Sequence, residues 1–429
     1  MSKRQSDMLY SIISYGCQMN EYDSARIAAL LEFHGLSLAK NICEANFILV
    51  NTCSVRAKAE ENAIARIKDL KPLKKNRDLK IGILGCMAKN RGESLFKDLP
   101  FLDFVLAPDE YSKLPQILLG PNAEGKSEYE PFAKLANNYS ALVAIQSGCN
   151  MRCSYCIVPF VRGMEQYREP VSVLNEIKEA VAKGVSEVTL LGQTVNGYRY
   201  KGLNFAGLLK QIAEINGIER VRFISPHPKH YTGELLEVLL SEKKVAPHVH
   251  LPAQSGSNSI LKKMKRQYTK ENFLSIVEAL RFSNPFYGIT TDIICGYPGE
   301  TESEFEETLQ LLQEAQFDNA FTFAYSSREG TPSALEKELI AEDEKKARLQ
   351  RVIDLQNSIT LERARLMVGQ NEKILLEKVS RRNSEEWLGK TGSFKKTLVP
   401  ASPSFKAGMY VDCMIEGVNG HTLRGRVIA

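Results

Sequence analysis

The sequence feature that most restricts the fold is a repeated alternation of strand-like and helix-like segments between about residue 138 and residue 365. Each apolar strand-like segment is followed by a polar or glycine-rich loop and then by a segment with helical periodicity. Such strand-like segments occur before Cys149 and at residues 187–191, 221–224, 248–251, 288–294 and 320–325. Eight such units close a standard barrel, so six predict a partial (β/α)6 barrel. Function is expected on the loops after its strands.

The first third of the chain predicts a separate domain with an open parallel α/β sheet. Its strand-like segments at 9–15, 47–50 and 80–84 alternate with helical segments at 23–33 and 58–70. A turn-rich polar stretch at 120–140 then breaks the pattern and predicts a linker.

Three cysteines of this first domain, Cys17, Cys53 and Cys86, each follow the end of a strand-like segment. The carboxyl ends of parallel strands share one edge of a sheet, so we expect the three thiols to converge there. Three thiolates suit an iron–sulfur cluster with one open iron. The alternative is three unrelated buried cysteines, since free cysteine is among the most buried residue types. Cys43 has no such placement and is interpreted as a packing residue.

A second group of cysteines lies in the loop after the first strand of the predicted barrel. Cys149, Cys153 and Cys156 have the spacing C-x3-C-x2-C. Three thiolates on one loop can hold three irons of a four-iron cluster and leave the fourth open, which favours chemistry over electron storage. The alternatives are a zinc site completed by a distant ligand, or buried cysteines without a metal.

The composition is that of an ordinary globular protein, with 43% apolar and 25% charged residues and a net charge of +5. At 429 residues, two or three domains are expected. No apolar run approaches the ~20 residues of a membrane span, and the polar start of the chain has no signal-peptide core. We therefore expect a cytoplasmic protein without a membrane partner, whose cysteines are reduced thiols or metal ligands.

Residues 368–429 predict a small all-β barrel with a basic surface. This stretch contains ten Lys or Arg and six Asp or Glu, so it carries most of the chain's net charge. Trp387 and Phe394 lie among its lysines, a combination that favours RNA binding through the backbone. Lys395, Lys396 and Arg424 are the predicted RNA contacts. The alternative is a solubilising cap domain.

Several motifs together resemble the methylthiotransferase family of radical S-adenosylmethionine (SAM) enzymes. Besides the loop with Tyr155 before its last cysteine, they are the segments at 15–20, 51–56, 85–86, 250–257 and 423–425. The resemblance covers residues 9 to 428 and is greatest to the branch that acts on a prenylated adenosine in tRNA. It implies a methylthiotransferase domain at 8–125, a radical SAM domain at 135–367 and a TRAM RNA-binding domain at 368–429.

The resemblance also implies the chemistry. Cys149, Cys153 and Cys156 would hold a [4Fe-4S] cluster whose open iron binds SAM, and Cys17, Cys53 and Cys86 an auxiliary [4Fe-4S] cluster that carries the inserted sulfur. The implied reaction is methylthiolation of C2 of N6-dimethylallyladenosine beside the anticodon of tRNA. It would consume two SAM molecules per turnover and require an external electron donor. Tyr155, Gln193, Gln254, Ser255 and Gly296 are candidate SAM contacts. Arg162 and Arg168 are candidate contacts to the anticodon stem-loop, and a monomer is expected.

Two other functions remain open on the sequence. A sister methylthiotransferase would act on threonylcarbamoyl-adenosine in tRNA or on an aspartate of a ribosomal protein. Gln18-Met19-Asn20 after Cys17 favours the prenylated substrate. A non-catalytic iron–sulfur RNA-binding protein is the alternative of another class.

Overall fold

The computed structural model describes residues 8–54, 57–75, 77–121, 123, 138–337 and 340–428. Most of the predicted linker and the pair Val55-Arg56 lie outside these residues. The chain forms two compact units. The first contains Met1–Ala136, Leu142–Met151 and Cys156–Gln166, and the second contains Asn137–Ala141, Arg152–Tyr155 and Tyr167–Ala429.

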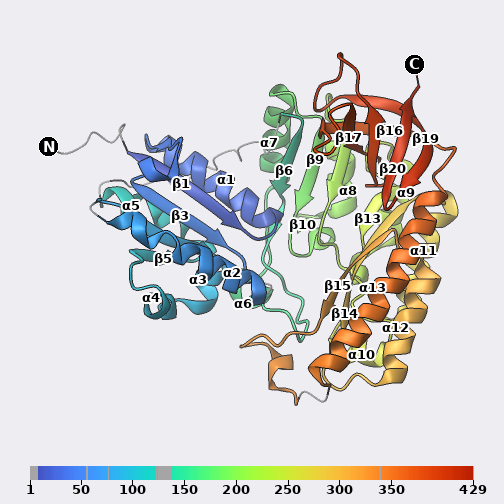
Figure 1. Cartoon of the computed structure of the whole chain (residues 1–429), viewed down its shortest axis with the longest axis horizontal. Coiled ribbons are helices and arrows are strands. Elements are labelled where there is room, and N and C mark those ends of the chain that lie inside the picture. Colours follow the sequence, from blue (N-terminus) through green and yellow to red (C-terminus); the bar gives the residue numbers. More distant parts are fainter. Residues whose placement is uncertain are drawn as a thin grey trace. The chain divides into compact units, whose positions relative to one another are not determined.

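The first unit is built on a five-stranded sheet with the order β2-β1-β3-β4-β5 (Figure 1). Every neighbouring pair in this sheet is parallel, which confirms the open parallel sheet. The strands are β1 (Leu9–Tyr15), β2 (Ser37–Leu38), β3 (Phe47–Thr52), β4 (Lys80–Gly85) and β5 (Phe104–Leu106).

Helices cover both faces of this sheet because its central strands are apolar on both sides. In β3, Ile48 and Val50 face the core that packs against α2 (Ala57–Lys68), α3 (Cys86–Arg91) and α4 (Ser94–Asp98). Phe47 and Leu49 face the opposite core, which contains α1 (Gln18–Phe33) and α5 (Leu114–Leu119). Helix α1 begins five residues before the predicted 23–33 segment, directly after Cys17.

The second unit contains the strands of the predicted partial barrel. Two three-stranded sheets have the orders β12-β9-β6 and β13-β14-β15, and an isolated parallel bridge joins Val221 to Val245. The strands are β6 (Ser140–Ala144), which crosses into the first unit, β9 (Glu187–Leu191), β12 (Arg220–Phe223), β13 (His248–His250), β14 (Gly288–Cys295) and β15 (Asn319–Ala324). The six strands confirm the (β/α)6 architecture.

The helices after these strands follow the predicted order. They are α6 (Val158–Arg162), α7 (Pro170–Ala182), α8 (Phe205–Ala213), α9 (Gly233–Ser241), α10 (Asn258–Lys263), α11 (Lys270–Ser283) and α12 (Glu302–Ala315). Capping side chains fix several starts: at α12, Thr301 and Glu304 form a reciprocal capping box. Two short ladders were not predicted: the hairpin of β10 (Arg199–Tyr200) and β11 (Leu203–Asn204), and the pair β7 (Gln146–Ser147) and β8 (Gln166–Tyr167).

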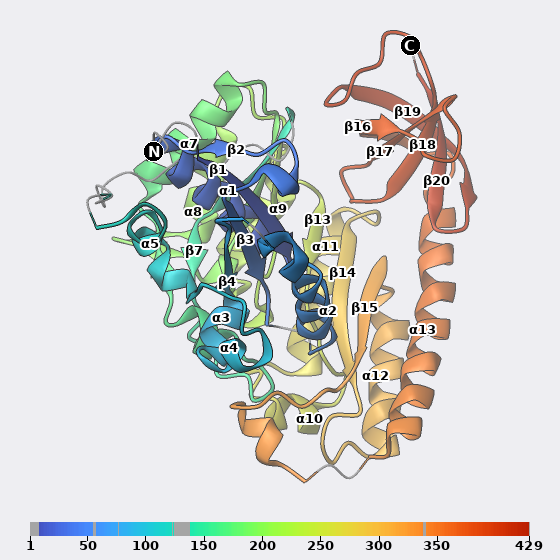
Figure 2. The ribbon, with the colours of Figure 1, turned by 60° about the vertical axis from the view of Figure 1, so that its left-hand side comes forward.

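The C-terminal module is a closed five-stranded barrel with the order β16-β17-β18-β20-β19. Its strands are β16 (Asn371–Val379), β17 (Glu386–Lys390), β18 (Lys396–Pro400), β19 (Tyr410–Asn419) and β20 (Thr422–Val427). The long helix α13 (Glu342–Arg365) runs beside α12 and leads into this C-terminal barrel (Figure 2). Ala364 and Met367 pack against Ile415 and Leu423 of this C-terminal barrel.

One local interpretation is corrected by the structure: Cys43 is exposed rather than packed. The start of α13 is rich in charged residues, yet Lys345 and Arg348 are buried there, and Arg348 pairs with the buried Glu300. Among the described residues, no helix combines the length and the apolar character that crossing a membrane would require.

Candidate functional site: two sets of three cysteines

The first set, here called the auxiliary site, consists of Cys17, Cys53 and Cys86 at one edge of the first unit's sheet. Each lies within two residues of the end of β1, β3 or β4, and these three strands are neighbours. Their ends are in register, since Tyr15 pairs with Thr52 and Thr52 with Gly85. The structure thus brings the three residues to one edge, where the strand pattern predicted them.

The environment of Cys17 favours its thiolate. A hydrogen bond with the Cys53 thiol is the main cause that lowers the pKa of Cys17 to about 6. Backbone amides and the charge of Arg162 also lower this pKa, whereas burial opposes them. Gly16 lets the backbone before Cys17 lie close to Cys53. Its φ is +150°, and a Cβ added there would be 2.6 Å from the Cβ of Cys53. A thiolate is the form that binds metals.

Arg162 places a guanidinium at this site. Its Nε donates to the Cys86 Sγ at 3.1 Å, and its Nη1 lies 2.7 Å from the Asp23 Oδ2. The Arg162 side chain is only 5% exposed, so it cannot contact an RNA phosphate as it stands. This placement disagrees with the predicted RNA contact.

These residues fit an iron–sulfur cluster better than a single metal ion. No three His, Cys, Asp or Glu side chains among the described residues are arranged to hold one ion. A four-iron cluster needs a different arrangement, because each thiolate binds a different iron. The three cysteines follow neighbouring strand ends, one has a lowered pKa and one receives an N–H donor, so the donors present suit a cluster.

The second set, here called the SAM loop, consists of Cys149, Cys153 and Cys156. In the first unit, the Cys149 amide donates to the Gly163 carbonyl at 3.0 Å. Gly148 precedes it at φ +78°, and an added Cβ would be 2.1 Å from the Met164 carbonyl oxygen. Cys149 is buried, whereas Cys156 is half-buried.

Cys153 belongs to the second unit, where a buried arginine donates to it. The Arg266 Nη1 lies 3.3 Å from the Cys153 Sγ, its Nη2 donates to the Pro252 carbonyl and its Nε to the Tyr268 hydroxyl. Arg266 is 4% exposed. Next to Cys153, the Ser154 hydroxyl donates to the Lys263 carbonyl.

The candidate SAM contacts lie in or after barrel strands, in varied environments. Tyr155 packs in a buried cluster with Ile260, Met264, Tyr297 and Tyr325. Gln193 follows β9 and is half-buried.

Gln254 is buried and has a left-handed φ of +71°, and its backbone N–H donates to the backbone carbonyl of Asp292. The Ser255 hydroxyl contacts the Thr308 hydroxyl at 3.3 Å and so already has a partner. Gly296, at φ +73°, lies under the aliphatic stem of Lys345.

The other candidate RNA contacts divide by exposure. Arg168 pairs with Glu176, and Lys395 is nearly buried with its Nζ 2.6 Å from the Asp318 Oδ1. Lys396 is exposed, and Arg424 is half-exposed beside Glu386. Only these last two remain open to a large anion.

Sequence reasoning missed other exposed cations of the C-terminal barrel. Arg381 and Arg382 lie at the turn between β16 and β17, Lys378 lies near the end of β16, and Lys406 lies before β19. None of the four makes an ion pair with a described residue. The signal was present as basic residues clustered in a turn.

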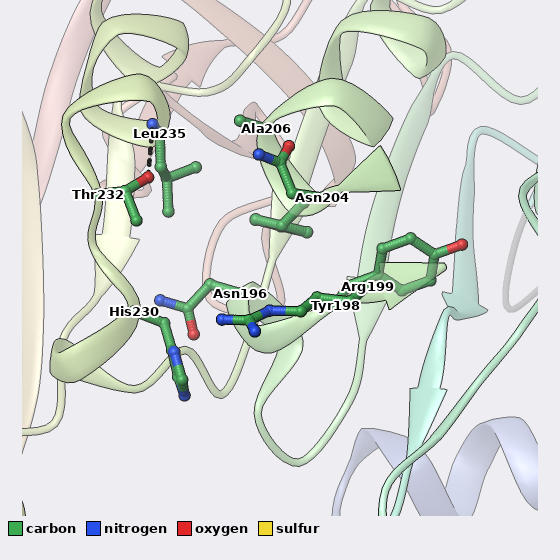
Figure 3. A pocket seen from close by; sticks show the side chains of 9 residues that line it. Asn196, Tyr198, Arg199, Asn204, Ala206, His230, Thr232 and Leu235 are labelled. Atoms are coloured by element: carbon green, nitrogen blue, oxygen red, sulfur yellow. Dashed lines mark hydrogen bonds between the residues drawn. The ribbon is translucent and has the colours of Figure 1, made fainter. Parts of the chain in front are cut away.

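The second unit also has a pocket of about 200 Å³ beside the barrel loops (Figure 3). It lies between the β10–β11 hairpin and the starts of α8 and α9. Arg199, which is exposed, extends along it toward Asn196. Asn204 and Thr232, the N-caps of α8 and α9, line its other side together with His230.

The partial barrel with a three-cysteine loop after its first strand defines the class of this protein. Residues 143–312 match the family model of the radical SAM superfamily, so the chain is a radical SAM enzyme. Residues 9–107 match a second family model, described as uncharacterized protein family UPF0004.

Curated relatives extend over nearly the whole chain. The tRNA-2-methylthio-N(6)-dimethylallyladenosine synthase of Moorella thermoacetica is 39% identical over 436 residues, which are 98% of each chain. Those of Geobacter metallireducens and Natranaerobius thermophilus are 40% and 38% identical and cover 98% and 97% of this chain and 98% and 96% of theirs. The chain therefore belongs to the family of tRNA-2-methylthio-N(6)-dimethylallyladenosine synthases.

Solved structures share the fold at low identity. The radical SAM methyltransferase TsrM from Kitasatospora setae aligns with a TM-score of 0.57 at 15% identity, over 76% of this chain and 75% of its own. The cobalamin-dependent SAM radical enzyme OxsB gives 0.54 at 12% identity, over 82% and 57%. The family does not favour the sister methylthiotransferases or the non-catalytic protein considered from the sequence.

Proposed function

We propose that this chain methylthiolates C2 of N6-dimethylallyladenosine beside the anticodon in tRNA, and that it works in the cytoplasm on that RNA. The observation that carries the proposal is the occurrence of two three-cysteine sets in a chain similar over its full length to synthases of that name. A methyltransferase needs no sulfur source, whereas insertion of a methylthio group does.

The SAM loop is the proposed generator of the radical. Cys149, Cys153 and Cys156 would hold one [4Fe-4S] cluster and Cys17, Cys53 and Cys86 a second. When bound, the first supplies the electron that cleaves SAM and the second the sulfur, with two SAM molecules used per turnover. Arg266 would balance the charge of a cluster held at Cys153, and the buried Tyr155 cluster would keep that side of the loop free of water.

The RNA contacts are proposed on the C-terminal barrel and at the pocket. Lys396, Arg424 and the basic turn with Arg381 and Arg382 suit phosphates because their charges reach solvent. The pocket beside Arg199 combines aromatic and apolar walls with a cation, which suits an unstacked base of the anticodon loop. A loop adenine is splayed out at modest cost.

Iron content and product analysis test this proposal together. Anaerobic reconstitution of the wild type should give about eight irons per chain, and Cys17→Ala with Cys53→Ala about four. This variant should still form 5′-deoxyadenosine from SAM but add no methylthio group to tRNA, as read by mass spectrometry of nucleosides. Retention of all the iron by the variant would refute the auxiliary site.

A second measurement tests the substrate. Nucleosides from cells that lack the gene should retain the prenyl group on the adenosine beside the anticodon and lose only the methylthio group. Loss of methylthio from threonylcarbamoyl-adenosine instead would assign the chain to a sister reaction. The matched control is the same strain complemented with Cys43→Ala, an exposed cysteine outside both sets.

A further inference from the structure

Arg162 is a buried guanidinium with more N–H donors than acceptor groups around it. It ends α6, six positions after Cys156, and its side chain is 5% exposed. Asp23 balances its charge at 2.7 Å, yet its Nε is aimed at the Cys86 Sγ at 3.1 Å. Its Nη2 is buried without a hydrogen-bond partner among the described residues. A buried N–H without an acceptor costs about 1–3 kcal/mol, so the site has capacity for further negative charge.

The segment that carries Arg162 is fixed to both sets of cysteines within the first unit. Ile157 and Val161 form a buried cluster with Cys86. One residue beyond Arg162, the Gly163 carbonyl accepts the Cys149 amide. A single short segment thus donates to one ligand of the auxiliary site and accepts from one ligand of the SAM loop.

We propose that Arg162 is a positioning residue of the auxiliary cluster. Its guanidinium holds Cys86 through an N–H···S bond, and Asp23 balances its charge and fixes its orientation. The inference rests on the proposed function, in which Cys17, Cys53 and Cys86 hold that cluster. It gives Arg162 a role inside the protein in place of the RNA contact suggested by the sequence.

The consequence is a raised reduction potential of the auxiliary cluster. A hydrogen bond to a cluster sulfur stabilises the reduced form, which carries one more electron. Removal of Arg162 should lower the ratio of reduced to oxidised cluster at a fixed potential at least tenfold, or ~59 mV for a one-electron couple.

The test isolates the auxiliary cluster in full-length protein with all three SAM-loop cysteines changed to alanine. In this background, Arg162→Gln is combined with Asp23→Asn so that no buried carboxylate loses its partner. Dithionite supplies the electron through mediator dyes, and the reduced cluster is followed by electron paramagnetic resonance. The control is Arg66→Gln, which removes a surface cation that pairs with Asp69.

A tenfold lower ratio in the double variant, with the control unchanged, supports the proposal. If the double variant loses the auxiliary cluster but keeps a wild-type circular dichroism spectrum, that result supports the proposal as well. An unchanged potential overturns it. If the double variant does not fold, Arg162→Lys decides, because lysine keeps the charge but lacks the forked donors: an unchanged ratio then overturns the role.

The failure of the proposed function has a different signature. If the background protein itself binds no cluster, the auxiliary site is wrong whatever Arg162 does. In protein with both clusters, Arg162→Gln should form 5′-deoxyadenosine at close to the wild-type rate but yield at least tenfold less methylthiolated tRNA. A parallel loss of both products would overturn the specific role at the auxiliary site.

Discussion

Lys395 and Lys396 are adjacent in sequence but should respond in opposite ways to substitution. Lys396 is exposed at the start of β18. Lys395 is 9% exposed and pairs with Asp318 at 2.6 Å, where Arg281 and Arg363 also lie within 3.4 Å. Burial raises the pKa of Asp318, but the three cations more than offset it, so that carboxyl stays ionised.

The magnitudes follow from these environments. Lys396→Met should remove one phosphate contact and reduce the salt slope of RNA binding by about 0.8, so its defect shrinks ~3-fold between about 50 and 200 mM salt. Removing one partner of a buried pair costs about 3–5 kcal/mol. Since Asp318 keeps two arginines, Lys395→Met should cost less, about 1–2 kcal/mol.

The assay is fluorescence anisotropy with a labelled anticodon stem-loop over a salt series, together with thermal unfolding of each variant. We expect Lys396→Met to change the slope but not the melting midpoint, and Lys395→Met to do the reverse. A reduced salt slope in Lys395→Met with a wild-type midpoint would refute the assignment of this lysine to the interior.

Three further predictions concern the second unit. Burial raises the pKa of Glu372 from 4.5 to about 7 in the folded protein. The folded state therefore binds this proton more tightly than the unfolded chain does. The free energy of unfolding should fall by about 1–3 kcal/mol as the pH rises from 4.5 through 7. Glu372→Gln should abolish that fall in urea titrations across this range. Arg266→Gln should slow SAM cleavage 10–100-fold, because it removes the donor to Cys153, and a wild-type rate would contradict this. Gly288→Ala should lower the melting midpoint by the equivalent of about 1–3 kcal/mol, since its Cβ would lie 2.3 Å from the Ser393 carbonyl oxygen. The matched control is Gly233→Ala, whose added Cβ would have no atom within 4 Å and whose φ is not left-handed, so its midpoint should stay close to that of the wild type.

The part of the site that sequence could predict depends on local rules. Cys17, Cys53 and Cys86 were predicted to converge because parallel strands in register must bring their ends to one edge. The spacing of Cys149, Cys153 and Cys156 is itself the signal for the second set. The six-unit barrel followed from periodicity alone.

The part that sequence could not predict depends on which charge meets which across long separations. Arg162 and Lys395 were predicted to be RNA contacts, yet each side chain is largely buried against a carboxylate far away in sequence, Asp23 and Asp318 respectively. No periodicity encodes such pairing. The start of α13 shows the same limit, because Lys345 is buried with its stem over Gly296.

The buried Arg266 predicts that cluster loading and stability are coupled. Among the described residues, Arg266 makes no ion pair with a carboxylate although it is 4% exposed, and its one sulfur partner is Cys153. An uncompensated buried cation costs several kcal/mol, which cluster thiolates would offset.

Reconstitution should therefore raise the melting midpoint of the chain. The Cys17→Ala, Cys53→Ala variant should gain only the part due to the SAM loop, because its auxiliary site stays empty of iron. Equal midpoints for the metal-free and reconstituted wild type would contradict the coupling and would mean that Arg266 is balanced without a cluster.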